Sequence, residues 1–374
     1  MTTRNKALVL VGTRPEAIKL FPVIQALKAR EDIVTKVCAT AQHREMLDAV
    51  LRFAGIAPDH DLDVMRNNQS LDELTARLLA GVGRVLDEER PQRVVVQGDT
   101  TTAMAGALAA YYRRCPVSHV EAGLRTGDPY APWPEEVNRR IVATIADQHF
   151  APTERSAENL RRENIAPDRI YVTGNTVIDA LLQTRRAIEN NPSLAPLSHD
   201  IARKYAGKNI ILVTCHRRES FGASMVAIGQ ALMRLLENPD VAIVLPMHPN
   251  PLVRQSLGAA LQTHPRAEII APQDYEEFVG LMAAAKLVLT DSGGIQEEAP
   301  ALGKPVLVLR NTTERPEAIE AGTAKLVGTD PDVIVSQAET LLNDEAQYRA
   351  MARAHNPFGD GHASDRIVGI ISRW

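Results

Sequence analysis

Cysteine is scarce in this 374-residue chain. Its three cysteines, Cys38, Cys115 and Cys215, are odd in number and far apart, so no disulfide framework and no zinc-binding motif is visible. We therefore expect no bound metal and a reducing compartment, the cytoplasm.

Long hydrophobic runs are also missing. The first apolar run, Ala7–Val11, stops at Gly12-Thr13-Arg14, too soon for a signal peptide or a membrane span. It is better explained as a buried strand. No later segment has the length of a transmembrane helix, so we predict no membrane association.

A strong charge of either sign is absent. The chain has 42 basic and 46 acidic residues, which leaves a net charge of -4 at neutral pH. This balance gives no electrostatic reason to expect a nucleic-acid partner or an anionic membrane surface.

The usual cofactor-binding motifs are not found. No G-x-G-x-x-G follows the first apolar run, and Gly81-Val82-Gly83 lies inside a helical pattern. No P-loop sequence is present either. We therefore expect no NAD, no ATP and no other cofactor.

Apolar runs do alternate with helical patterns through the first half of the chain. The predicted strands are Ala7–Val11, Val34–Ala39, Arg93–Gln97, Val117–Val120 and Ile170–Thr173. The predicted helices are Pro15–Lys28, Arg44–Phe53, Leu71–Glu88, Thr101–Tyr112, Glu135–Ala146 and Thr153–Arg162. Such alternation is typical of an α/β fold with a parallel sheet covered by helices on both faces.

The alternation restarts after a stretch rich in Pro, Asn and Ser, at residues 190–199. The strands predicted beyond it are Asn209–Thr214, Val241–Leu245, Glu268–Ala271, Lys286–Thr290 and Pro305–Leu309. We predict two doubly wound domains that face a cleft. The expected boundaries are residues 1–185, completed by a helix within 356–374, a linker of residues 186–200, and residues 201–355.

Two of the loops that follow predicted strands have the chemistry of an anion site. In the first, Gly12 permits a sharp turn and Pro15 suits the first position of a helix, so exposed helix N–H groups and Arg14 can meet an anion. Lys19 lies one turn further along the same face. An ordinary strand-to-helix turn with a solvated arginine explains the first loop equally well.

The second loop is Thr290-Asp291-Ser292-Gly293-Gly294, directly before a helix. Its glycines allow the backbone to approach a phosphate or a diphosphate, and Ser292 adds a hydroxyl donor. Glu298 can accept hydrogen bonds from ribose hydroxyls. Its alternative role is a favourable interaction with the helix dipole.

Three acidic residues follow strands or begin helices in the first half of the chain. Asp99 and Glu121 follow neighbouring predicted strands, and Glu135 opens a helix one turn before Arg139. A single acid at a helix start is usually structural, as a cap. Three acids that converge on one cleft are better explained as a functional site.

The second domain adds a basic loop, Thr214-Cys215-His216-Arg217-Arg218, after its first strand. His216 can exchange protons near neutral pH, and the arginines can hold a phosphate or a carboxylate. An ion-paired surface loop is the alternative. His248 follows the next strand and, taken alone, is better explained as structural.

Together these segments closely resemble the bacterial non-hydrolysing UDP-N-acetylglucosamine 2-epimerases. Nine motifs occur in that family's order: GTRPEAIKL from Gly12, AQHREML from Ala41, GDTTT from Gly98, HVEAGLRTGD from His119, PWPEEVNR from Pro132, TGNTVIDAL from Thr173, HRRESFG from His216, DSGGIQEEAPALGKPV from Asp291 and TERPEA from Thr313. The resemblance covers residues 7–360, and its length makes it specific.

The resemblance implies a fold and a set of site residues. The family has two Rossmann-like domains in the GT-B arrangement, with the active site in the cleft between them, and its members form homodimers. The implied catalytic residues are Lys19, Asp99, Glu121, Glu135 and His216. The implied UDP-binding residues are Arg14, Phe278, Ser292, Gly293, Gly294, Glu298 and Arg315. Some members bind a second, regulatory UDP-sugar, and residues similar to that site are Gln42, His43, Glu136, Arg217 and His248.

The activity that the resemblance implies is reversible inversion of carbon 2 between UDP-N-acetylglucosamine and UDP-N-acetylmannosamine. The reaction proceeds by elimination of UDP to 2-acetamidoglucal and re-addition, and its product supplies cell-surface polysaccharides. Four alternatives stay open: a hydrolysing epimerase that releases N-acetylmannosamine, an epimerase for a related UDP-sugar such as a diacetamido uronic acid, a GT-B glycosyltransferase, and a non-enzymatic nucleotide-sugar sensor. The intact GTRPE segment argues against the first, and the PWPEE segment against the second.

Overall fold

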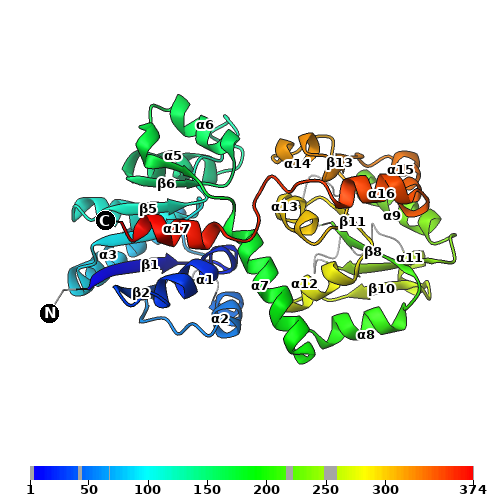
Figure 1. Ribbon diagram of the computed structural model, residues 1–374, viewed down its shortest axis with the longest axis horizontal. Coiled ribbons are helices and arrows are strands. Elements are labelled where there is room, and N and C mark those ends of the chain that lie inside the picture. Colours follow the sequence, from blue (N-terminus) through cyan, green and yellow to red (C-terminus); the bar gives the residue numbers. More distant parts are fainter. Residues whose placement is uncertain (1–3, 41–43, 67, 216–221, 248–258, 374) are drawn as a thin grey trace. The chain divides into compact units, whose positions relative to one another are not determined.

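The chain forms two compact units, each with its own parallel β-sheet and packed helices (Figure 1). The computed structural model describes residues 4–40, 44–66, 68–215, 222–247 and 259–373. The first unit contains residues 1–180 and 358–374, and the second contains residues 181–357. The predicted α/β class, with one parallel sheet in each half of the chain, is confirmed.

The first unit is built on a seven-stranded sheet with the order β3-β2-β1-β4-β5-β6-β7. All neighbouring strands are parallel. The strands are β1 (Asn5–Val11), β2 (Ile33–Ala39), β3 (His60–Asp61), β4 (Arg93–Gln97), β5 (Val117–Val120), β6 (Gln148–Ala151) and β7 (Ile170–Val172). The strand order reverses between β1 and β4. This reversal is the topological switch point, where ligands of such sheets bind.

Helices form two layers on this sheet. They are α1 (Arg14–Lys28), α2 (Arg44–Phe53), α3 (Leu71–Glu89), α4 (Thr101–Tyr112), α5 (Glu135–Ile145), α6 (Glu154–Arg162), the 3-10 turn η1 (Pro167–Arg169), the start of α7 (Thr176–Asn190), and α17 (Ala363–Ile371). Helices α3, α4 and α5 pack on one another, and their core includes Leu8, Leu10, Val94 and Val96 of the sheet. The alternate strand residues point to the opposite face, which α1 covers.

The end of the chain returns to the first unit as α17, which packs beside α1 (Figure 1). The Asp179 carboxylate in α7 accepts hydrogen bonds from the Ala363 N–H (3.2 Å), the Ser364 N–H (2.8 Å) and the Ser364 hydroxyl (2.5 Å). A buried carboxylate therefore caps the first turn of α17 and fixes the helix to α7.

The second unit has a six-stranded parallel sheet with the order β10-β9-β8-β11-β12-β13. Its strands are β8 (Asn209–Thr214), β9 (Val241–Pro246), β10 (Ala267–Ile270), β11 (Leu287–Thr290), β12 (Val306–Val308) and β13 (Ala324–Leu326). The order reverses between β8 and β11, so this sheet also has a topological switch point.

The helices of the second unit include most of the segment predicted to be a linker. They are α8 (Pro196–Lys204), α9 (Ala223–Leu235), α11 (Ala259–Thr263), α12 (Tyr275–Ala284), α13 (Gly293–Ala301), α14 (Pro316–Glu320), α15 (Pro331–Asn343) and α16 (Glu345–Ala352), with a 3-10 turn η2 (Pro192–Leu194). Residues 186–200 contain the end of α7, η2 and the start of α8. The division between the units lies earlier, within α7, at residues 180–181.

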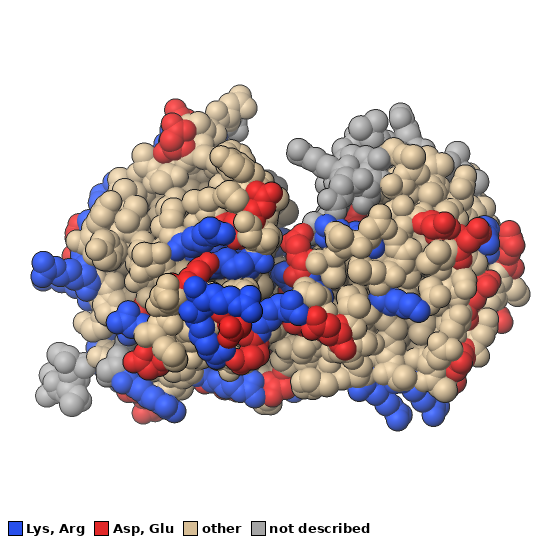
Figure 2. Space-filling model, turned by 90° about the horizontal axis from the view of Figure 1, so that it is seen from above, with Lys and Arg blue, Asp and Glu red and all other residues tan. Residues whose placement is uncertain are grey.

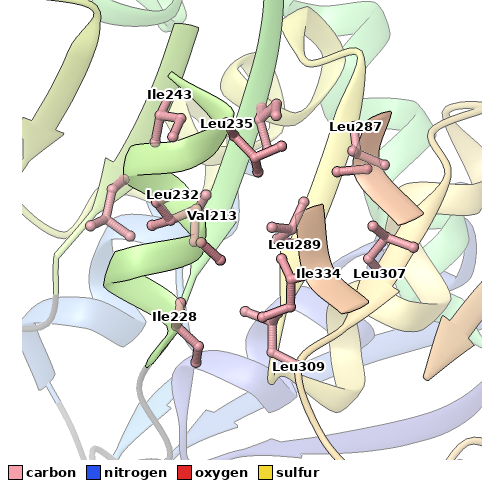
Figure 3. Close-up of a cluster of buried hydrophobic side chains, with 14 of the residues drawn as sticks. Val213, Ile228, Leu232, Leu235, Ile243, Leu287, Leu289, Leu307, Leu309 and Ile334 are labelled. Atoms are coloured by element: carbon pink, nitrogen blue, oxygen red, sulfur yellow. The ribbon is translucent and has the colours of Figure 1, made fainter. Parts of the chain in front are cut away.

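The second unit has a well-defined hydrophobic core (Figure 3). Val213 of β8, Leu289 of β11 and Leu307 of β12 meet Leu232 of α9 and Ile334 of α15, and all five side chains are fully buried. Helices cover both faces of the strands, so the strands are continuous apolar runs and were readily predicted.

Three strands were not predicted from the sequence: β3, β6 and β13. β3 has two residues, and β6 (QHFA) and β13 (AKL) contain polar residues. Each pairs with a strand that was predicted (β3 with β2, β6 with β5 and β7, β13 with β12), so its strand conformation depends on tertiary pairing more than on its own apolar pattern.

The surface of the protein carries both signs of charge, as its balanced composition predicts. On the face shown in Figure 2, both signs of charge are present, and where several basic side chains adjoin, acidic ones lie among them. Among the described residues, no helix combines the length and the apolar composition needed to cross a bilayer.

Candidate functional site

Two loops flank the switch point of the first sheet. Gly12 and Thr13 connect β1 to α1, and the loop from Gly98 to Thr100 connects β4 to α4. A Cβ atom at Gly12 would lie 2.2 Å from the Thr102 hydroxyl oxygen and 2.7 Å from that of Thr40. Glycine is therefore required for the close approach of the two loops.

Glu16 ties these loops together. Its carboxylate accepts hydrogen bonds from the N–H groups of Thr13 (2.7 Å) and Gly12 (3.1 Å) and from the Thr100 hydroxyl (2.7 Å). The Thr13 hydroxyl accepts a bond from the Glu16 N–H, which completes a capping box. Burial nevertheless raises the pKa of Glu16 to about 7. Glu16 was not among the predicted site residues, although the T-x-x-E spacing of a capping box was visible in the sequence.

Glu121 is a buried carboxylate held by donors from three directions. Lys19 Nζ lies 2.6 Å from both of its oxygens, and the Asn175 side-chain amide donates to it at 2.9 Å. The Gln97 amide donates to Oε2. The Glu121 backbone is in the left-handed region, with a φ of 62°. Backbone strain of this kind is concentrated at functional sites.

Asp99 is oriented by α5. Arg139 Nε and Nη2 lie 2.8 Å and 2.7 Å from Asp99 Oδ2, and the Asn138 side-chain amide donates to the Asp99 carbonyl at 2.9 Å. His119 supports the same turn, because its Nε2 lies 2.8 Å from the Gly98 carbonyl oxygen. Burial lowers the pKa of His119 to about 3, so the imidazole is neutral and Nε2 is the donor.

These side chains surround a cavity of about 620 Å³ in the first unit. Its charged lining residues are two cations and four acids: Arg14, Lys19, Glu16, Asp99, Glu121 and Glu135. The structure thus brings together, from α1, the loops after β4 and β5 and the start of α5, all the predicted first-domain residues for diphosphate contact and catalysis. Acids beside cations in one cavity provide acid–base groups and a place for an anion.

Glu136, predicted for the second sugar site, is fully buried. Its carboxylate accepts hydrogen bonds from the N–H groups of Thr126 (3.1 Å) and Gly127 (3.3 Å) and pairs with Arg139 (3.1 Å) and Arg140 (3.2 Å). The pKa of Glu136 is lowered: burial raises it, but these backbone and arginine donors outweigh the burial. In the described structure this carboxylate fixes the loop before α5.

The switch point of the second sheet carries the predicted phosphate loop. Thr290 ends β11, and its hydroxyl lies 2.6 Å from that of Thr214 at the end of β8 and accepts the Ser292 N–H at 2.9 Å. α13 begins directly afterwards at Gly293. A Cβ at Gly294 would lie 3.4 Å from Glu298 Oε1, so both residues face the same side of α13.

Arg315 is joined to this loop through α13. Its guanidinium pairs with the buried carboxylate of Glu297, and its N–H donates to the Thr313 hydroxyl at 3.0 Å. The Thr313 hydroxyl donates to Gln296 at 2.6 Å, and Gln296 donates to the Ser292 carbonyl at 3.1 Å. Ser292, Gly293, Gly294, Glu298 and Arg315 are therefore one connected group.

The remaining predicted residues are placed differently. Phe278 lies half-buried on α12. The other five lie outside the described residues: Gln42, His43, His216, Arg217 and His248. Within the described ranges, no group of three or more His, Cys, Asp or Glu residues is arranged to hold a metal ion.

Comparison with known proteins gives consistent matches along the whole chain. The sequence model of the UDP-N-acetylglucosamine 2-epimerase family matches residues 25–372. The UDP-N-acetylglucosamine 2-epimerase of Escherichia coli K12 is 53% identical over 371 residues, which are 98% of each chain. The structure of the Neisseria meningitidis enzyme bound to UDP-GlcNAc is 45% identical, with a TM-score of 0.88, over 99% of this chain and 100% of that one. The Methanocaldococcus jannaschii enzyme in complex with UDP-GlcNAc and UDP is 35% identical, with a TM-score of 0.80, over the same shares.

Proposed function

Because the chain belongs to the UDP-N-acetylglucosamine 2-epimerase family, we propose that it interconverts UDP-N-acetylglucosamine and UDP-N-acetylmannosamine without releasing free sugar. The observation that carries this proposal is the cavity in the first unit, where Lys19, Asp99, Glu121 and Glu135 meet. A nucleotide-sugar sensor needs neither such a group of acids nor a lysine paired with one of them.

The second unit supplies the groups that hold the diphosphate. The Ser292 hydroxyl and the N–H groups at the start of α13 are donors for phosphate oxygens, and Gly294 lets the backbone approach them. Glu298 accepts from the ribose hydroxyls. Arg315 adds positive charge, and its pairing with Glu297 fixes the plane of its guanidinium. Phe278 is proposed to lie beside uracil.

The chemistry begins with the departure of UDP, because carbon 2 has no adjacent carbonyl group to stabilise a carbanion. Cleavage of the C1–O bond places positive charge on C1 and acidifies the C2–H. Loss of that proton gives 2-acetamidoglucal and UDP. Return of a proton to the opposite face of C2, with re-addition of UDP at C1, yields the epimer. All atoms are retained, so no cofactor is required.

The side chains of the first unit match the needs of this sequence. Proton removal and return require acid–base groups, which Asp99, Glu121 and Glu135 provide, and His216 is proposed to assist. Developing negative charge on the leaving diphosphate is stabilised by cations, for which Arg14 and Lys19 line the same cavity. Lys19 also orients the Glu121 carboxylate through two contacts of 2.6 Å.

Product analysis tests the proposal. The protein is incubated with UDP-N-acetylglucosamine alone, and the products are identified by NMR. We expect UDP-N-acetylmannosamine in equilibrium with the substrate, with no accumulation of free sugar. Free N-acetylmannosamine and UDP would show a hydrolysing epimerase instead, and a dependence on an added acceptor would show a glycosyltransferase. If the substrate is unchanged, the protein is a nucleotide-sugar sensor and not an enzyme.

Four family properties complete the proposal: a homodimer, cytoplasmic localisation, a product used for cell-surface polysaccharides, and regulation by a second UDP-sugar at Gln42, His43, Glu136, Arg217 and His248. For Glu136 this last role has a structural condition. Its carboxylate already accepts from two backbone N–H groups and two arginines, so a second sugar must replace at least one of these donors.

A further inference from the structure

The second unit contains a cavity of about 270 Å³ away from its phosphate loop. The lining residues come from the second half of α7, from α8, from the second half of α12, and from the segment between α13 and β12. Lys304 precedes β12, whereas the phosphate loop follows β11. In a parallel sheet these positions are at opposite strand ends, so the cavity is separate from the proposed diphosphate site.

The walls of this cavity are held in place by close helix contacts. A Cβ at Gly280 of α12 would lie 2.3 Å from the Ser198 hydroxyl oxygen of α8, so glycine sets the separation of these helices. The Glu277 carboxylate accepts the N–H groups of Leu197 and Ser198, both at 2.9 Å. The cavity is therefore preformed between fixed elements.

Most of the lining is apolar. Ile188, Val279 and Leu302 are buried, with 7%, 0% and 9% of their surface exposed, and each contributes to the wall. The small side chains of Ala202, Ala283 and Ala284 leave the space open. Such a surface accommodates a hydrocarbon body.

One cation of the lining has no counter-ion of its own. Arg185 pairs with Glu189 at 2.7 Å, and Lys286, just outside the lining, lies 3.7 Å from the centre of the Tyr348 ring. The Lys304 ammonium group has no hydrogen-bond or ion-pair partner within the described ranges. Burial, with the positive charges of Arg185 and Lys286 nearby, lowers the pKa of Lys304 to about 8.

We propose that this cavity binds a small carboxylate with an apolar body, whose head pairs with Lys304 and whose hydrocarbon part packs against Ile188, Val279 and Leu302. The carboxylate supplies the partner that the lysine lacks, and it lies close enough to Arg185 to share its charge. A partly buried cation without a partner is costly, and an anion that fills an apolar cavity reduces that cost while it buries its own hydrocarbon surface. The site is independent of the proposed epimerase activity, because none of its residues lies in the catalytic or UDP-binding set.

Octanoate is the probe for the test, and NMR of protein labelled at alanine methyl groups is the measurement. We expect saturable shifts of the Ala202, Ala283 and Ala284 methyls in the full-length protein. Octan-1-ol has the same chain length and no charge, so it forms no ion pair with Lys304 and should bind at least about tenfold more weakly. Lys304→Met should weaken octanoate binding by a similar factor, whereas the matched control Lys325→Met, at an exposed lysine that donates to Gln337, should leave it unchanged.

The melting temperature and the epimerase turnover of Lys304→Met are measured as well. Lys304→Met replaces an unpartnered charge by an unbranched apolar side chain only one atom shorter, so it should not lower the melting temperature, and it should leave epimerase turnover intact. Shifts that do not saturate, equal binding of octanoate and octan-1-ol, or undiminished octanoate binding by a folded Lys304→Met protein would each overturn the assignment.

Discussion

Glu121 combines three properties that rarely occur together: burial, a left-handed backbone and side-chain donors on several sides. Its strand was predicted from the apolar run Val117–Val120, and its proximity to Asp99 from the expected pairing of neighbouring strands. Its partners were less predictable. Asn175 lies 54 residues away along the chain and reaches Glu121 because the loops after β5 and β7 lie at the same carboxyl-terminal end of the parallel sheet.

Replacement of this carboxylate by an amide is the first prediction. Glu121→Gln loses the ion pair with Lys19 and any acid–base function, so turnover should fall by at least about a hundredfold. The protein should stay folded, because the amide is nearly isosteric. The matched control is Asp87→Asn, which removes a carboxylate of an exposed pair with Arg113 and should leave turnover unchanged. The steady-state turnover rate of each variant is measured, and circular dichroism checks that each variant is folded. A near-normal rate for Glu121→Gln would remove Glu121 from the proposed catalytic set.

The second prediction concerns Glu16, whose pKa burial raises from 4.5 to about 7. Between these values the folded state binds more protons than the unfolded state, so the free energy of unfolding falls as the pH rises through this window. The loss should be on the order of 2 kcal/mol. Glu16→Gln, which has no proton to lose, should show a correspondingly flatter profile.

Urea denaturation of wild type and Glu16→Gln at pH 5 and pH 8 measures the difference. Comparison of the two proteins cancels the contributions of other groups, among them His119, whose lowered pKa acts in the opposite direction below pH 6.5. Parallel pH profiles for the two proteins would show that Glu16 does not titrate in this range.

At the scale of elements, regular apolar periodicity was the reliable guide. The predicted strands at 93–97, 117–120 and 209–214 and the helices at 44–53 and 101–112 have the observed bounds. β6 was missed because its sequence, QHFA, has no apolar alternation, and its second residue, His149, is a buried histidine. Capping side chains explain several helix starts that apolar periodicity alone leaves open, such as Ser70 with Glu73 at the start of α3.

The attachment of α17 gives the third prediction. Asp179→Ala leaves two buried N–H groups and the Ser364 hydroxyl without their acceptor, and it should destabilise the protein by about 1–3 kcal/mol. Asp365→Ala, in the exposed first turn of the same helix, should cost about 0.3–1 kcal/mol through the helix dipole. Chemical denaturation measures the free energy of unfolding of both variants. Equal stabilities of the two variants would show that the cap does not hold α17.

At the scale of the whole molecule, we propose that the two units contribute different groups to the reaction. The first contributes the acids and Lys19 around its cavity, and the second contributes the loop from Ser292 to Glu298 with Arg315. The two-sheet organisation followed from strand–helix alternation. The division between the units lies at residues 180–181, where α7 is a continuous helix and its sequence shows no break.

The exchange of the C2 proton with solvent tests the central claim most directly. The protein is incubated with UDP-N-acetylglucosamine in D2O until the two epimers reach equilibrium, and both are analysed by proton NMR and mass spectrometry. The elimination route predicts UDP-N-acetylmannosamine with deuterium at C2, because the returning proton comes from a side chain that exchanges with solvent. An epimer that retains its original hydrogen at C2 would contradict the account.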